Sequence, residues 1–145
     1  MYGMELKERI DRFIDDLPVI KSDRHVYIWG TGNTASLYQE GLDRESRLDI
    51  YGYADNNSQK WGGIFAGKKV FSPEDVMNDD SACVLICSPQ PSVVATVSRQ
   101  LSDMGLLFYH IDAVIWGLHK EELRKIFEVL YDDESRGVLL EIMES

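Results

Sequence analysis

Short apolar runs alternate along the chain with segments in which apolar residues recur every three or four positions, a pattern typical of an α/β protein. The runs predict five strands, over residues 26–29, 50–54, 70–71, 83–87 and 106–111. The repeats predict helices over residues 4–17, 92–104 and 120–130, after Asn33, after Ser72, and over a last segment with Val138, Leu139, Ile142 and Met143. Strands that alternate with helices favour a doubly wound, mostly parallel sheet with the strand order 3-2-1-4-5.

Three polar or glycine signals predict where helices begin and end. Ser72-Pro73-Glu74-Asp75 is a strong helix start, with Ser as N-cap, Pro at the first helical position and acids in the first turn. Gly105 is expected just after the helix 92–104. Residues 131–135 break one C-terminal helix and cap the next.

Residues 56–69 show no helical period and predict an ordered loop that crosses the sheet without a helix.

The stretch that follows the first strand carries the main chemical signal. Gly30-x-Gly32-x-x-Ala35 has the G-x-G-x-x-G/A spacing of a dinucleotide-binding turn, and Asn33 can cap the helix that follows. In such a turn the first glycine makes the bend, the second lets the backbone approach a phosphate, and the helix N-terminus attracts an anion. This motif predicts a Rossmann-like domain.

An acid is expected about 20 residues further on, at the end of the second strand, where it can bind ribose hydroxyls. Asp55 stands there. In the expected complex a nucleotide diphosphate lies on the backbone of the glycine turn, the ribose on Asp55, and the distal part near the end of the fourth strand. The candidate binding residues are Gly30, Thr31, Gly32, Asn33, Thr34, Asp55, Asn56, Ser88, Pro89 and Gln90. The alternative is that residues 55–57 form only a turn, in a Rossmann-like fold with an empty or degenerate site.

Composition and charge narrow the kinds of partner. The 145 residues suit one domain, with 44% hydrophobic and 28% charged residues. A formal net charge of −10 argues against nucleic acid and against an anionic membrane surface as partners. Cys83 and Cys87, about 13 Å apart if they share a strand, cannot pair with each other, and we expect them to be buried, reduced and cytoplasmic. No His or Cys spacing predicts a metal site.

Other motifs in the sequence give weaker evidence for a ligand or a reaction than the glycine turn does. Residues 62–69 nearly match a P-loop, but Lys69 stands where a Mg²⁺-binding hydroxyl is needed and a strand follows. Lys60, Lys68 and Lys69 are expected on a solvated loop, with contact to a phosphate as the alternative. None of the seven tyrosines has the Tyr-x-x-x-Lys spacing that short-chain dehydrogenases and sugar epimerases use. His110, with Asp112 two residues on, is the best candidate general base, although a structural role is the more common one. The catalytic residues, if any, stay unidentified.

Several short motifs in a fixed order resemble the Rossmann-like N-terminal domain of FkbM-type methyltransferases and related sugar-modifying enzymes of bacterial polysaccharide pathways. The resemblance spans about residues 24–140 and is carried by residues 28–33, 52–57, 61–62, 67–70, 72–75, 84–88 and 132–136. It implies an accessory module that binds a nucleotide or a nucleotide sugar. In such enzymes the methyltransferase domain follows the connector, where this chain ends, so any S-adenosylmethionine site is expected outside this segment.

The expected organisation is an N-terminal helix and link (1–24), a nucleotide-binding domain (25–112) and a helical connector or interaction tail (113–145). The terminal helices are expected to contact a second domain or a second copy of the chain; the alternative is that they cover a sheet edge. Three functions stay open: a binding module, a fragment of an NAD(P)-dependent oxidoreductase or epimerase, and a structural or dimerisation domain. The sequence does not separate NAD(P) from a nucleotide sugar, because Asp55 suits the ribose of either.

Overall fold

The computed structural model describes residues 2–32, 35, 37–38, 48–130 and 132–145. They form two compact units, residues 20–111 and a helical unit of residues 1–19 with 112–145. The strands are β1 (His25–Trp29), β2 (Ile50–Ala54), β3 (Ile64–Phe65), β4 (Lys68–Phe71), β5 (Ala82–Ile86) and β6 (Leu107–His110). The helices are α1 (Tyr2–Asp15), the 3₁₀ helix Ser58–Lys60, α3 (Pro73–Met77), α4 (Pro91–Asp103), α5 (Ile111–Leu118), α6 (Lys120–Val129) and α7 (Asp133–Glu144).

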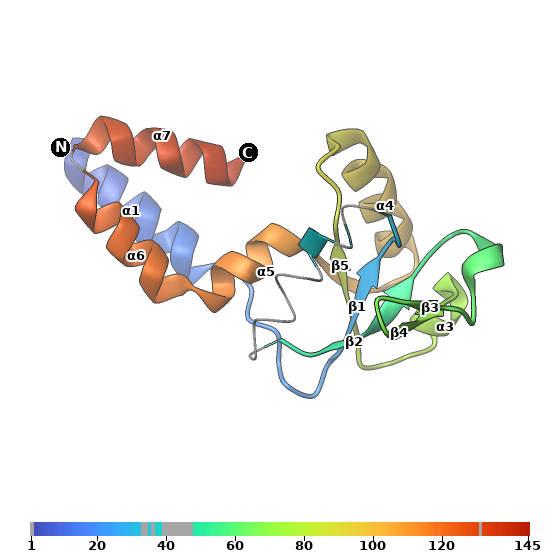
Figure 1. The fold of residues 1–145 in the computed structure, drawn as a ribbon. Coiled ribbons are helices and arrows are strands. Elements are labelled where there is room, and N and C mark those ends of the chain that lie inside the picture. Colours follow the sequence, from blue (N-terminus) through green and yellow to red (C-terminus); the bar gives the residue numbers. More distant parts are fainter. Residues whose placement is uncertain (1, 33–34, 36, 39–47, 131) are drawn as a thin grey trace. The chain divides into compact units, whose positions relative to one another are not determined.

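The sheet has the order β3-β4-β2-β1-β5-β6 (Figure 1). The five predicted strands correspond to β1, β2, β4, β5 and β6, which pair in parallel, so the predicted order 3-2-1-4-5 is confirmed. The sixth strand, β3, was not predicted and pairs antiparallel with β4. The fold is therefore α/β, with a mostly parallel, doubly wound sheet and flanking helices.

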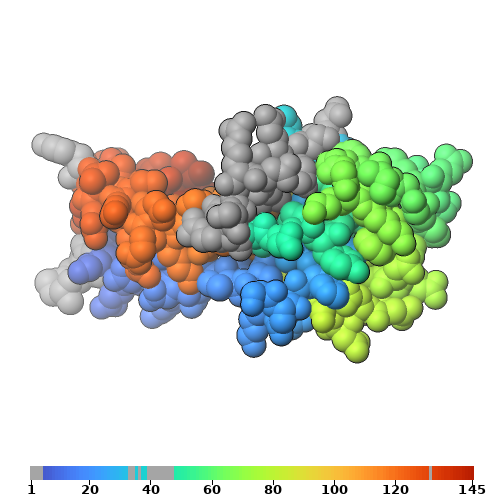
Figure 2. Space-filling model, turned by 60° about the horizontal axis from the view of Figure 1, so that its bottom comes forward, coloured from blue at the N-terminus to red at the C-terminus, as the bar shows by residue number. Residues whose placement is uncertain are grey.

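The sixth strand arises from a hairpin in the segment that was predicted as a loop. Ala66 and Gly67 both have positive φ, 48° and 79°, which is the backbone of a type I′ turn. The same segment also contains the 3₁₀ helix, capped by the Asn57 side chain, which accepts from the N–H of Gln59. The expectation of a loop without helix was wrong here, because Ala is uncommon in such turns and gives no signal for a hairpin. The space-filling view shows this green segment at the surface of its unit (Figure 2).

One face of the sheet packs against α3 and α4. The core on this face joins Tyr27 and Trp29 of β1 to Val97 and Leu101 of α4, and Val76 of α3 lies fully buried in it. Three predicted helix signals are confirmed: the Ser72 hydroxyl accepts from the N–H of Asp75, Gly105 has φ 71° after α4, and Asp132 caps α7. The central strand β5 is buried along its whole length.

The helical unit has its own apolar core. Leu6, Ile10 and Ile14 of α1 are buried with Leu123 and Phe127 of α6 and with Leu140 of α7. The Arg124 guanidinium bridges α6 to α1 through Asp15, at 2.5 Å. The tail was predicted to hold two helices, whereas it holds three, because residues 111–118 form α5. No described helix has a long enough apolar stretch to cross a membrane.

At the amino end of β1, a part-buried carboxylate links this strand to the α3–β5 connection. Asp79, in the α3–β5 connection, accepts from the Tyr27 hydroxyl at 2.6 Å and from the Ser81 N–H at 2.9 Å, and lies 2.8 Å from His25 Nδ1. Burial alone raises the pKa of Asp79, but these hydrogen bonds outweigh it and lower the pKa below 3.8. The ionised form of Asp79 therefore stabilises the fold.

Asp79→Asn is expected to lower the free energy of unfolding at pH 7 by about 1–3 kcal/mol, because it removes charge-assisted hydrogen bonds. A lowered folded-state pKa gives stability that is present above the unfolded pKa and is lost as pH falls through the folded one. The difference between wild type and variant should therefore shrink below about pH 4. Urea unfolding at pH 7, 5 and 3 measures it, with the exposed neighbour in Asp80→Asn as control. An equal difference at pH 7 and pH 3 would contradict the role given to the Asp79 charge.

Candidate functional site

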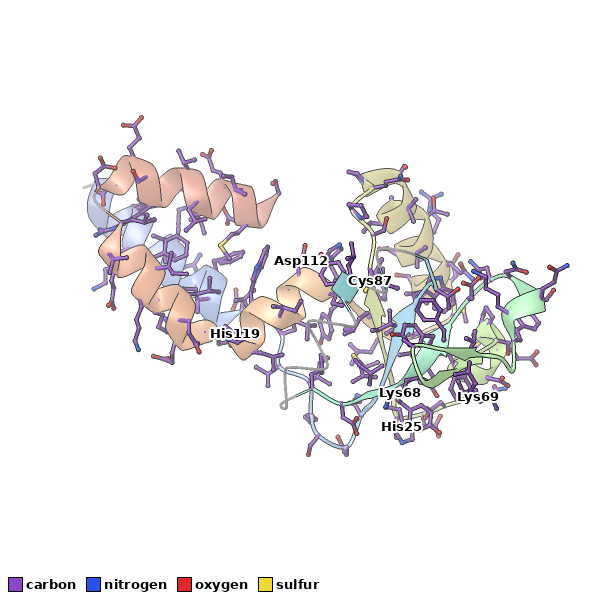
Figure 3. All side chains as sticks on the ribbon, viewed as in Figure 1. His25, Lys68, Lys69, Cys87, Asp112 and His119 are labelled. Carbon is purple, nitrogen blue, oxygen red and sulfur yellow. The ribbon has the colours of Figure 1, made fainter. Side chains whose placement is uncertain are left out.

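A cleft of about 300 Å³ opens at the carboxyl ends of β1, β2 and β5. In a doubly wound sheet, this edge is where ligands bind, at the point where the strand order reverses. Figure 3 shows Cys87, just after β5, at the opposite end of the sheet from His25, the first residue of β1. The cleft is lined by Trp29, Gly30, Gly32, Ala35, Asp55, Asn56, Ile86, Cys87, Ser88, Val93 and Val97.

The glycine turn forms one wall of the cleft with its backbone. Gly30 has φ 99°, a conformation that side chains rarely adopt, and its N–H donates to the carbonyl oxygen of Ala54 at 2.7 Å. Gly32 is exposed, and a Cβ placed on it would have no atom of the described residues within 4 Å, its chain neighbours aside. The two glycines thus act differently: Gly30 makes the bend, and Gly32 leaves space next to the backbone.

Asp55 stands opposite the glycine turn at the end of β2. Its Oδ2 accepts from the Thr31 hydroxyl at 2.8 Å, and its Oδ1 accepts from the N–H of Asn57 at 2.8 Å. The Lys60 ammonium lies 3.8 Å from Oδ2 and donates to the Thr31 hydroxyl at 2.8 Å. The carboxylate is therefore held in place by Thr31 of the turn, by the N–H of Asn57 and by the Lys60 cation.

Of the other candidate residues, some line the cleft and some do not. Asn56 lines the cleft and exchanges two side-chain hydrogen bonds with Gln100 of α4, at 3.1 and 2.8 Å. Ser88 also lines the cleft, and its hydroxyl accepts from the N–H of Gln90 at 3.2 Å. Pro89 and Gln90 are exposed beside it, outside the lining. Asn33 and Thr34 lie outside the described residues.

The structure adds residues that the sequence did not indicate. Val93 and Val97 of α4 give the cleft an apolar wall. The sequence placed both valines on one side of a helix, but helical period alone cannot separate a cleft wall from core. Lys60 was assigned to a solvated loop, and it reaches Thr31 and Asp55 only because the 3₁₀ helix turns it back toward the sheet.

His110, the candidate general base, is the last residue of β6, and its Nε2 lies 3.1 Å from the Ser88 carbonyl oxygen. Asp112 belongs to the next element, α5. Cys83 and Cys87 are both buried, as predicted, and neither is in a disulfide. Burial raises the pKa of the Cys83 thiol to about 11. No group of His, Cys, Asp or Glu in the described ranges has the arrangement of a metal site.

A parallel doubly wound sheet, a glycine turn after its first strand and a cleft at the strand-order reversal define a Rossmann-like domain. More particularly, the chain belongs to the C2185-like, N-terminal family, whose model matches residues 22–112. No match was found among the curated proteins.

Solved structures share the fold at low sequence identity. Methyltransferase FkbM from Methylobacillus flagellatus KT is 12% identical, with a TM-score of 0.64 over 96% of this chain and 46% of that one. The chain thus spans about half the length of that protein. UDP-D-quinovosamine 4-dehydrogenase from Vibrio fischeri is 14% identical, over 66% of this chain and 86% of that one, with a TM-score of 0.49. The Rex-family repressor RSP in complex with β-NADH is 18% identical, over 70% of this chain and 62% of that one, with a TM-score of 0.41. The likeness to methyltransferase FkbM supports a Rossmann-like fold.

Proposed function

We propose that this chain is a nucleotide-binding module and that the cleft at the carboxyl ends of β1, β2 and β5 is its binding site. The observation that carries the proposal is the pairing of an open backbone at Gly32 with a fixed carboxylate at Asp55 across one cleft. Backbone N–H groups without a side chain in front of them suit a phosphate, and a carboxylate suits ribose hydroxyls.

In the proposed complex, the diphosphate lies on the backbone of the glycine turn, of which the structure describes Gly30, Thr31 and Gly32, and the ribose lies at Asp55. Val93 and Val97 offer an apolar wall to the base, and residues 88–90 lie next to the distal part of the ligand. Two acceptor positions of the Asp55 carboxylate are occupied by Thr31 and Asn57. A carboxylate has about four lone-pair sites, so capacity for a ribose hydroxyl remains.

We further propose that the module is accessory to a separate catalytic domain of a sugar-modifying enzyme or a methyltransferase. The match to about half of methyltransferase FkbM supports this arrangement. No described residue of the cleft offers the acid–base pair that hydride transfer to a sugar needs. The site is therefore assigned binding rather than catalysis.

A thermal-shift panel tests the proposal with NAD⁺, NADP⁺, UDP- and CDP-sugars, S-adenosylmethionine and buffer. A ligand present at about 100 times its dissociation constant adds about 2.7 kcal/mol to the free energy of unfolding. That should raise the melting temperature by about 5 °C or more for a unit of this size. A shift with one ligand class identifies the class. The absence of a shift with every ligand would overturn the proposal and favour a structural or dimerisation domain.

A further inference from the structure

The cation beside Asp55 is the feature of the cleft that a plain ribose site does not need. Lys60 Nζ lies 3.8 Å from Asp55 Oδ2 and donates to the Thr31 hydroxyl, which itself donates to the same carboxylate oxygen. In many Rossmann-like domains the acid at the end of the second strand binds a free ribose hydroxyl, whereas a nearby cation accommodates a ribose phosphate. Here both groups are present and in contact.

The chain holds Lys60 at this position through the turn that follows β2. Lys60 is the last residue of the 3₁₀ helix, and its N–H donates to the carbonyl oxygen of Asn57 at 3.0 Å. The next residue, Trp61, donates its indole N–H to the carbonyl oxygen of Asp55 at 2.7 Å. These bonds tie the segment that carries Lys60 to the end of β2, while its side chain stays 45% exposed and can meet a ligand.

At this end of the cleft a cation lies beside the carboxylate that would meet the ribose. Lys60 offsets the negative charge of Asp55, which would otherwise repel a phosphate. An ammonium has three N–H donors, so Lys60 can keep its bond to Thr31 and donate to a phosphate oxygen at the same time. Lys60 lies beside the cleft, next to the lining residue Asp55, and the described lining residues themselves include no Lys or Arg.

We propose that the cleft prefers a nucleotide with a phosphate monoester on the ribose bound at Asp55, and that Lys60 is the residue that binds this phosphate. The inference rests on the proposed function and narrows its ligand class. Two ligand types share this chemistry, namely dinucleotides with a 2′-phosphate and coenzyme A with a 3′-phosphate. Unmodified NAD and nucleotide sugars lack the group.

Isothermal titration with two ligand pairs tests this inference: NADP⁺ against NAD⁺, and coenzyme A against dephospho-coenzyme A. Within each pair the ligands differ only in the ribose phosphate. The wild type is expected to bind one phosphorylated ligand at least about tenfold more tightly than its partner, as a charge-assisted hydrogen bond implies. Which pair shows the preference distinguishes the 2′-phosphate from the 3′-phosphate.

Three variants distinguish phosphate recognition by Lys60 from a loss of affinity for every nucleotide. Lys60→Met should lower the affinity for the phosphorylated ligand about 10- to 100-fold. The affinity for the unphosphorylated member of the pair should stay within about threefold of the wild-type value. Lys60→Arg should retain the preference, because it keeps the cation. Lys68→Met should behave as the wild type, because among the described residues it is Lys60, and not Lys68 of β4, that pairs with Asp55 and donates to Thr31. Equal affinity within both pairs, or an equal loss of both members in Lys60→Met, would overturn the inference while the proposed function stands. No binding of any nucleotide would overturn both.

Discussion

Gly32→Val is expected to abolish nucleotide binding and to leave the fold intact. Gly32 is exposed, and its φ lies outside the range that favours glycine. Apart from its chain neighbours, no atom of the described residues lies within 4 Å of its Cβ position. Valine therefore fits the protein, but its isopropyl group fills the space in which a phosphate approaches the backbone. We expect a loss of at least about 100-fold in affinity, because a phosphate held away from its N–H donors loses charge-assisted hydrogen bonds. Titration with the ligand identified by the thermal-shift panel measures this loss.

Gly137→Val is a matched control for this variant. Gly137 lies in α7 of the helical unit, and its Cβ position is also without neighbours within 4 Å. It should bind nucleotide as the wild type does, and both variants should keep the wild-type melting temperature within a few degrees. Undiminished binding by folded Gly32→Val would remove the glycine turn from the binding site.

Gly52→Ala is expected to destabilise the sheet unit strongly. A methyl group on this buried residue of β2 would lie 2.6 Å from Cε2 of Phe71 and 2.9 Å from the carbonyl oxygen of Lys69. The second atom belongs to the backbone of β4, which pairs with β2 and cannot move aside without breaking the ladder. Overpacking of this kind typically costs about 1–3 kcal/mol, and we expect the upper part of that range because backbone is involved.

Urea unfolding of Gly52→Ala measures this cost, with Gly137→Ala as the control at a position that has room for a methyl group. The control is expected to be as stable as the wild type or slightly more so, because Ala favours a helix over Gly. The N–H of Asp55 donates to the carbonyl oxygen of Phe71 at 3.3 Å, so displacement of β4 should also weaken nucleotide binding. A wild-type unfolding midpoint for Gly52→Ala would show that the two strands separate more easily than their packing suggests.

The sequence alone determined the elements whose signals are local. The apolar runs at 26–29 and 83–87 predict the two central strands because buried parallel strands need apolar residues on both faces. Ser72, Gly105 and Asp132 mark helix ends because capping depends on one or two neighbouring residues. The glycine turn and Asp55 were found together because a parallel sheet brings the carboxyl ends of its strands to one edge.

The tertiary structure decided what depends on distant residues or on unusual local ones. The hairpin of β3 and β4 turns through Ala66 at positive φ. Because Ala rarely adopts this conformation, the sequence does not predict a hairpin turn there. Helix α5 begins directly after β6, where a mostly apolar segment has no polar face to set a helical period. Gly52 is needed because β4 passes close to it, and Lys60 enters the site because a 3₁₀ turn returns it to Thr31. Such contacts join residues on different elements, and one-dimensional spacing does not encode the distance between them.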